Sequence, residues 1–216
     1  MIQKIDFNCL QSQYENNKSQ DYKKIVLVDS YIQPASVLLD IGSGTGSFLE
    51  LVEKKFQFIF AVENDEQALT LLRNKFSNKS KIKIIPQSIT ELFKDDTNFL
   101  FFDTITCLDV LEHISLEECQ FTIKKIFEIL KPNGFFIISV PGIFEKIRIY
   151  MGKSPTHLHS HSSYGWAKML QNAGFKILII QTVEFPLIDH ILFRKYLHLF
   201  GKCCVIVAVK PEDNKI

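Results

Sequence analysis

Short apolar runs alternate along this chain with longer stretches in which apolar residues recur at three- and four-residue spacing. The runs predict buried strands, and the spaced stretches predict helices that bury one face. The predicted strands are residues 37–39, 58–62, 82–85, 102–108, 135–140, 176–181 and 204–209. The predicted helices are residues 48–55, 66–76, 116–130 and 164–172. Because strands and helices alternate, we predict an α/β fold in which helices cover both faces of a seven-stranded, mostly parallel sheet.

Local signals refine the ends of these elements. Ser162 or Ser163 is expected to cap the helix at 164–172, and Gly174 is expected to end it. Residues 36–216 are expected to form one domain, because a chain of 216 residues that is 46% hydrophobic can bury a sizeable core.

Two segments fall outside the alternating pattern. Residues 1–35 are polar and partly helical in pattern, and residues 183–202 form a strongly apolar stretch between the last two predicted strands. The second segment predicts a helical insertion packed on the domain. Its apolar residues lie near Arg194, Lys195 and Lys202, so a lid, a dimer surface or a membrane-touching helix are the alternatives.

Charge and cysteine content exclude several classes of protein. The formal net charge is +1, so no overall field draws the chain to nucleic acid or to an anionic membrane. The five cysteines have neither metal-ligand nor disulfide-framework spacing. No apolar run is long enough to span a membrane, and the first ten residues lack the apolar core of a signal peptide. We therefore expect reduced thiols, no transmembrane segment and a cytoplasmic location.

A glycine-rich turn is the most informative motif. It follows the strand at 37–39 and contains Asp40, Gly42, Gly44 and Gly46. Glycines at alternate positions let backbone N–H groups approach a small ligand closely. The third glycine comes one residue too early for a dinucleotide fingerprint. The next predicted strand ends at Glu63, about where doubly wound proteins place a carboxylate on ribose hydroxyls.

At this point the sequence resembles the class I S-adenosylmethionine-dependent methyltransferases. Residues 102–113 look like that family's fourth strand and the start of the following helix, and residues 130–140 look like its turn into the fifth strand. The resemblance implies a Rossmann-like sheet of seven strands, with residues 1–35 as a helical cap over the cofactor. Within the family, the segment after the fourth strand is similar to enzymes of quinone biosynthesis and to other enzymes that act on small molecules.

The resemblance also implies which residues bind S-adenosyl-L-methionine. The turn would hold the methionine portion, Glu63 would accept from the ribose hydroxyls, and Asn64 would lie beside the adenine. Ser88 stands where the family usually has an acid that receives the adenine amino group, and Ile89 follows it. The full set of expected cofactor-binding residues is Asp40, Gly42, Ser43, Gly44, Gly46, Glu63, Asn64, Ser88, Ile89, Leu108 and Asp109.

Two histidines are candidate general bases. His113 follows the fourth strand, and His157 precedes the helix at 164–172. A base is needed only where the acceptor carries a proton. We expect no metal. As an alternative, Asp109, Glu112 and His113 have helical i, i+3, i+4 spacing, and one of His157, His159 or His161 could complete a divalent-ion site of the kind found in certain RNA ribose and quinone-precursor O-methyltransferases.

The sequence therefore predicts an enzyme that moves a methyl group from S-adenosylmethionine to a small-molecule acceptor, most often at oxygen in the similar branch. Nucleic acid is not the expected partner, and a homodimer or surface contact through 183–202 is possible. Two alternatives stay open: a metal-assisted RNA ribose 2'-O-methyltransferase, and a non-catalytic cofactor-binding partner subunit.

Overall fold

The computed structural model describes residues 31–32, 36–94, 101–142, 144–153, 156–183 and 203–212. These residues contain a seven-stranded sheet with the order β3-β2-β1-β4-β5-β7-β6. The strands are β1 (Ser36–Ile41), β2 (Phe56–Glu63), β3 (Ile82–Pro86), β4 (Phe102–Leu108), β5 (Leu130–Pro141), β6 (Lys176–Val183) and β7 (Cys203–Val209). All pairings are parallel except those that β7 makes with β5 and β6. The predicted mostly parallel, seven-stranded sheet is confirmed.

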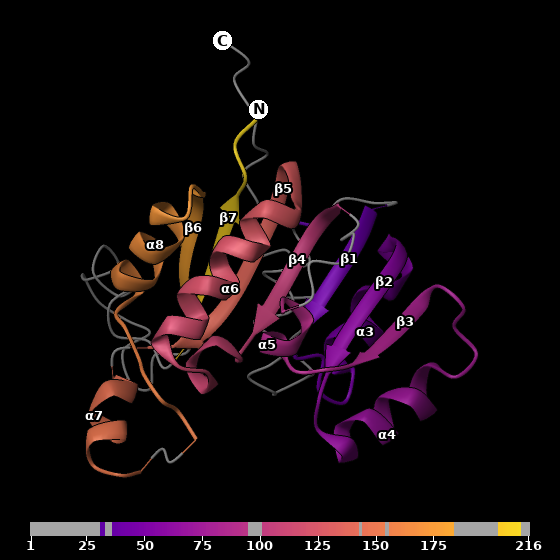
Figure 1. Cartoon of the computed structure of the whole chain (residues 1–216), viewed down its shortest axis with the longest axis horizontal. Coiled ribbons are helices and arrows are strands. Elements are labelled where there is room, and N and C mark those ends of the chain that lie inside the picture. The colour runs from indigo at the N-terminus through magenta and orange to yellow at the C-terminus, as the bar shows by residue number, and fades with distance from the viewer. Residues whose placement is uncertain are drawn as a thin grey trace, which may run out of the picture.

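Helices lie on both faces of the sheet (Figure 1). They are α3 (Ser47–Val52), α4 (Glu66–Phe76), α5 (Ile89–Leu92), α6 (Leu116–Ile129), α7 (Phe144–Tyr150) and α8 (Ser163–Asn172), with short 3-10 helices η1 (Glu53–Lys55) and η2 (Leu111–His113). One apolar core joins α5, α6 and α8 to the sheet, and a second joins α3 and α4 to the opposite face. Adjacent residues such as Leu38 and Leu39 enter different cores, since side chains alternate along a strand.

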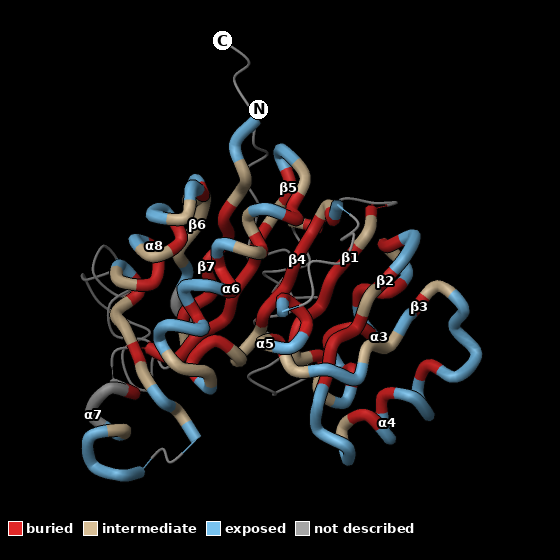
Figure 2. The backbone as a smooth tube through the Cα atoms, viewed as in Figure 1, coloured by how far each residue is buried: buried red, intermediate tan, exposed pale blue. Residues whose placement is uncertain are grey.

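The buried residues concentrate along the central strands (Figure 2). Strands that are buried on both faces need near-continuous apolar sequence, which explains why the runs at 135–140 and 204–209 were readable as strands. The arrowheads of β1, β2 and β4 point to one edge of the sheet (Figure 1). The chain runs from β1 to β2 and β3 on one side, and β4 returns to the other side of β1. In open α/β sheets, ligands bind beyond the carboxyl ends of the strands at such a reversal, which here lies between β1 and β4.

Several boundaries differ from the sequence expectation. Leu130 starts β5 instead of ending α6, and residues 131–134, which look like a turn, belong to the strand. The register explains this, because Phe102 pairs with Leu130 while Thr104 pairs with Phe135, so the extra residues bulge opposite a single residue of β4. The helix predicted at 48–55 is split into α3 and η1, and α5 and α7 were not predicted.

Other expectations can be placed directly. Ser162, one of two predicted caps, accepts a hydrogen bond from the Gly165 N–H and begins α8. Among the described cysteines, Cys107, Cys119 and Cys204 form no disulfide bond. Three expectations fall on residues outside the described part of the chain. They are the cap at 1–35 apart from Tyr31 and Ile32, the insertion at 183–202 apart from Val183, and Cys9.

A reciprocal cap at the start of α6 offers a test of the fold. The Ser115 side chain accepts from the Glu118 N–H, and the Glu118 side chain accepts from the Ser115 N–H. We expect Ser115→Ala to lower the free energy of unfolding by about 1 kcal/mol, because the Glu118 N–H loses its side-chain acceptor. Urea denaturation measures this. Glu117→Gln, in the same turn, is the control and should change stability by only a few tenths of a kcal/mol; equal losses in the two variants would contradict the capping role.

Candidate functional site: a glycine turn and a histidine pair

The glycine turn after β1 adopts a backbone that only glycine tolerates well. Gly42, Gly44 and Gly46 have φ values of 73°, 52° and 78°. The N–H groups of Gly42 and Ser43 donate to the carbonyl oxygen of Val62 at 2.8 and 2.9 Å. These bonds fasten the turn to the end of β2, so its position is set by the sheet.

The turn lies against the segment that follows β4. A Cβ atom added at Gly42 would lie 2.2 Å from Cγ2 of Val110, so a side chain is excluded there. At Gly44 no atom of the described residues lies within 4 Å of such a Cβ. Among these residues Gly44 therefore borders open space, on the side from which a small ligand can reach the backbone.

Glu63 connects the turn to β2. Its Oε2 accepts from the Gly44 N–H at 2.7 Å, and its Oε1 accepts from the N–H groups of Asn64 and Asp65 at 2.8 and 2.9 Å. Each carboxylate oxygen has more than one acceptor site, so the fixed carboxylate can still receive hydroxyl donors. Asn64 is exposed beside it.

Asp40 lies beneath the turn and is 2% exposed. Its Oδ1 accepts from the Thr106 hydroxyl at 2.6 Å, while Oδ2 has no hydrogen-bond partner among the described residues. Burial raises the pKa of this carboxyl from 3.8 to about 6, against the lowering effect of the hydrogen bond from Thr106. A buried carboxylate at this position favours a positively charged ligand in the turn above it, because its charge is poorly screened there.

The structure places Ser88 at the N-cap of α5. Its hydroxyl donates to the Glu91 carboxylate at 2.8 Å and accepts from the Glu91 N–H at 3.2 Å. This reciprocal cap competes with the predicted role of Ser88 as an acceptor for an adenine amino group. Ile89, the next residue, is buried in the core. The adenine roles of both residues stay predictions.

Asp109 departs from the expected helical face. It has a φ of 57°, its N–H donates to the Ser139 carbonyl at 2.9 Å, and its carboxylate accepts from the Ser139 hydroxyl. Helical spacing with Glu112 and His113 is therefore not realised, because only residues 111–113 form a short 3-10 turn. Leu108 is the last residue of β4 and is half-buried there.

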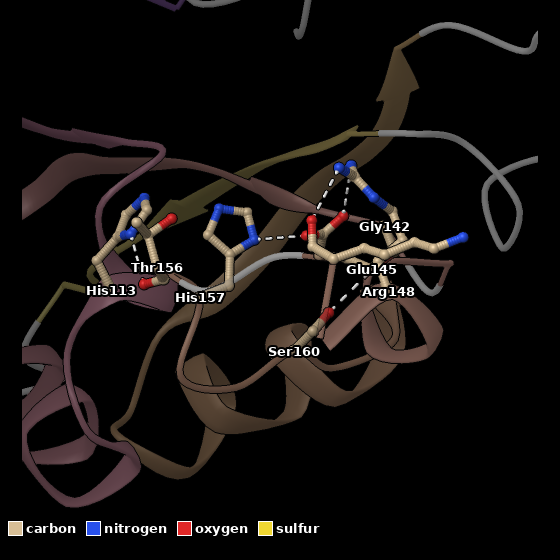
Figure 3. Close-up of polar contacts among 8 residues, drawn as sticks. His113, Gly142, Glu145, Arg148, Thr156, His157 and Ser160 are labelled. Atoms are coloured by element: carbon tan, nitrogen blue, oxygen red, sulfur yellow. Dashed lines mark hydrogen bonds and ion pairs between the residues drawn. The ribbon is translucent and has the colours of Figure 1, made fainter. Parts of the chain in front are cut away.

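His113 and His157 are brought together, although they lie 44 positions apart in the sequence. Their ring centroids lie 4.7 Å apart. Nδ1 of His113 lies 2.9 Å from the Thr156 carbonyl oxygen, and the Leu158 N–H donates to the Glu112 carbonyl at 2.8 Å. One side-chain and one backbone hydrogen bond thus hold the loop after α7 against η2. Figure 3 shows the pair with Glu145 and Arg148 on the far side of His157.

A carboxylate completes this cluster. Among the described residues, potential ligand atoms of Glu112, His113 and His157 lie within 4.8 Å of one another. Glu112 is buried, His113 is exposed and His157 is intermediate. Two imidazoles and a carboxylate at this separation can accept protons or bind a divalent cation.

The other two histidines of the loop do not join the cluster. The rings of His159 and His161 pack on Trp166, with centroids 5.4 and 5.1 Å from it. Burial lowers the pKa of His159. Cys107, in β4, is fully buried, and burial raises its pKa well above the usual value, which supports the interpretation of a packed thiol.

Sequence reasoning missed three residues that shape the site: Thr106, Ser139 and Glu145. Thr106 and Ser139 lie within apolar strands, and their partners Asp40 and Asp109 are far away in the sequence. A hydroxyl in an otherwise apolar buried run is the one available signal, because a buried polar group needs a partner. Glu145 lies in α7, a helix that was not predicted.

Comparison with known proteins places the chain in a family. Residues 14–179 match the sequence profile of the methyltransferase-domain family, so the chain belongs to it. The ubiquinone biosynthesis O-methyltransferase of Coxiella burnetii is 30% identical over 103 residues, which cover 47% of this chain and 42% of that protein. The carboxy-S-adenosyl-L-methionine synthase of Shewanella piezotolerans is 21% identical over 66% of this chain and 60% of its own length. The chain spans about half the length of the curated relatives it matches.

Solved structures agree with the fold. The N-methyltransferase NodS of Bradyrhizobium japonicum, in complex with S-adenosyl-L-homocysteine, has a TM-score of 0.69 and 14% identity, with 95% of this chain and 98% of that chain covered. The predicted class, a class I S-adenosylmethionine-dependent methyltransferase with a Rossmann-like sheet, is confirmed at the level of family and fold. Within the described part of the chain, no helix has the length and hydropathy needed to cross a bilayer.

The buried carboxyl beneath the turn generates a pH prediction. We expect the affinity for S-adenosylhomocysteine to be constant above about pH 6 and to fall by up to about tenfold per pH unit below it, because the cationic amino group favours ionised Asp40, whose pKa in the free protein is about 6. Calorimetry across pH measures this. Asp40→Asn should flatten the profile, and Asp103→Asn, near the amino ends of the strands, should preserve it. A pH profile that Asp40→Asn does not alter would contradict the electrostatic role.

Proposed function

We propose that the protein transfers a methyl group from S-adenosyl-L-methionine to an oxygen atom of a small-molecule acceptor. The observation that carries this proposal is the juxtaposition at one sheet edge of the glycine turn, Glu63 and the paired histidines. Val110, which touches Gly42, lies only two residues from Glu112. The glycine turn and the histidine pair are therefore neighbours beyond the carboxyl ends of the strands.

The residues present fit the cofactor. Gly44 borders open space, Glu63 offers a fixed carboxylate for ribose hydroxyls, and Asp40 places a buried carboxyl beneath the turn. The cofactor supplies an electrophilic methyl group on a sulfonium. The protein's task is then to align the acceptor oxygen with that methyl and to exclude water.

The histidine pair supports oxygen as the acceptor atom. A hydroxyl is a better nucleophile once its proton is removed, and an imidazole is suited to accept that proton near neutral pH. His113 and His157 are the candidate bases. The similarity to an O-methyltransferase of ubiquinone biosynthesis supports the same choice, although it covers only 47% of this chain.

Glu63 provides the test of cofactor binding. We expect Glu63→Ala to weaken S-adenosylhomocysteine binding roughly 10- to 100-fold, because charge-assisted bonds to the ribose are lost. Isothermal calorimetry measures the affinity, and circular dichroism verifies folding. Glu66→Ala, an exposed acid three residues further on, is the matched control and should bind normally. Unchanged affinity in folded Glu63→Ala protein, or tight NAD binding without binding of the homocysteine product, would overturn the proposal.

A metal-assisted reaction is the second candidate, and the convergence of Glu112, His113 and His157 favours it. A divalent ion bound there would polarise an acceptor hydroxyl and lower its pKa. In this case the histidines act as ligands and not as bases. An RNA ribose 2'-hydroxyl is one acceptor that this chemistry would suit.

Manganese titration separates the two candidates. The metal-assisted reaction predicts saturable Mn²⁺ binding, with affinity lowered roughly 10- to 100-fold in Glu112→Gln and unchanged in the control Glu117→Gln. Binding of RNA should in addition weaken as salt rises. If Mn²⁺ does not bind, or binds Glu112→Gln equally well, the second candidate is rejected and the metal-free reaction stands.

A further inference from the structure

Glu145 lies behind the histidine pair and is not explained by the cofactor site. It is the second residue of α7, and it is 7% exposed. Its Oε1 lies 2.8 Å from Nδ1 of His157, and its Oε2 lies 3.2 Å from Nη1 of Arg148 (Figure 3). The carboxylate is therefore held from two sides and directed at one ring nitrogen of a candidate base.

This contact determines which nitrogen of His157 carries the proton. The ring N–H is not aligned for a hydrogen bond to Oε1, but a carboxylate oxygen 2.8 Å away repels a lone pair on Nδ1, so a neutral imidazole favours its proton on that nitrogen. The lone pair then resides on Nε2, at the opposite side of the ring. The same reasoning applies to His113, since Nδ1 lies 2.9 Å from the Thr156 carbonyl oxygen, which can only accept. In both imidazoles of the pair, Nδ1 is thus the favoured position of the proton when the ring is neutral.

We propose that Glu145 is a positioning residue that holds His157 in the Nδ1–H tautomer and keeps Nε2 available as the basic nitrogen of the site. The inference rests on the proposed function for the role of His157 as a base, but the tautomer itself does not depend on turnover. The same orientation serves His157 if it binds a cation, because a ligating imidazole commonly donates its other N–H to a carboxylate.

The alternative is that Glu145 only stabilises the first turn of α7. An acid in the first turn of a helix interacts favourably with the backbone dipoles, and the i, i+3 pair with Arg148 adds to this. A helix-stabilising role would leave the tautomer of His157 unaffected. The state of the imidazole therefore distinguishes the two roles.

Long-range ¹H–¹⁵N correlation spectra of the full chain test the proposal at about pH 8, where an ordinary histidine is neutral. His157→Gln identifies the signals of this residue among the six histidines. In the unmodified protein we expect roughly a tenfold excess of the Nδ1–H form over the Nε2–H form. In Glu145→Ala we expect the Nε2–H form to be at least equally populated, because the acceptor is gone.

Arg148→Gln is the matched control, since it removes the contact with Oε2 but leaves Oε1 beside His157; its spectrum should retain the Nδ1–H form. A predominant Nε2–H form in the unmodified protein would overturn the proposal without any variant, and so would an unchanged tautomer in folded Glu145→Ala. S-adenosylhomocysteine binding is measured on the same samples. A correct tautomer in a protein that does not bind the nucleoside refutes the proposed function alone.

Discussion

The site depends on one backbone constraint, the left-handed glycine turn that the end of β2 holds in place. Three positive φ values within five residues would be strained with any side chain, and the Val62 carbonyl and the Glu63 carboxylate fix the turn through its N–H groups. Because Gly42 has no side chain, Val110 can pack against the turn. The segments after β1, β2 and β4 therefore meet at the glycine turn, and the other residues of the candidate site lie around it.

The histidine pair depends on a different kind of contact. His113 follows β4, whereas Glu145 and His157 come from the chain between β5 and β6, so no local pattern brings them together. A hydrogen bond between the His113 imidazole and the Thr156 carbonyl, and a backbone hydrogen bond between Leu158 and Glu112, hold this connection in place. The glycine turn is built into the end of the sheet, while the histidine pair is held by a loop and a short helix. In such an arrangement the loop is free to differ between relatives that share a cofactor.

Sequence patterns predicted the parts of the molecule that burial determines. The seven strands followed from apolar runs, and α4, α6 and α8 from three- and four-residue spacing, because each of these elements packs on the sheet. The patterns failed where the backbone depends on contacts that are distant in the sequence. The positive φ of Asp109, set by bonds to Ser139, broke the expected helical spacing, and the turn-like residues 131–134 became part of β5 because the pairing with β4 continues on both sides of them. His157 was one of three histidines that the sequence offered as partners of Glu112 and His113, but the choice among them and the contact with Glu145 required the fold.

The buried carboxyl of Asp40 links stability to ligand binding. A rise in pKa from 3.8 to about 6 means that ionising this group in the folded, ligand-free protein costs about 3 kcal/mol more than in water. Because the folded-state pKa is the higher one, the folded protein binds the proton more tightly and loses stability as the pH rises through this interval. At neutral pH the ligand-free protein thus contains an unfavourable buried charge. A cation bound in the turn above would reduce this cost. The buried carboxylate that lowers the stability of the ligand-free protein would thus increase its preference for a positively charged ligand.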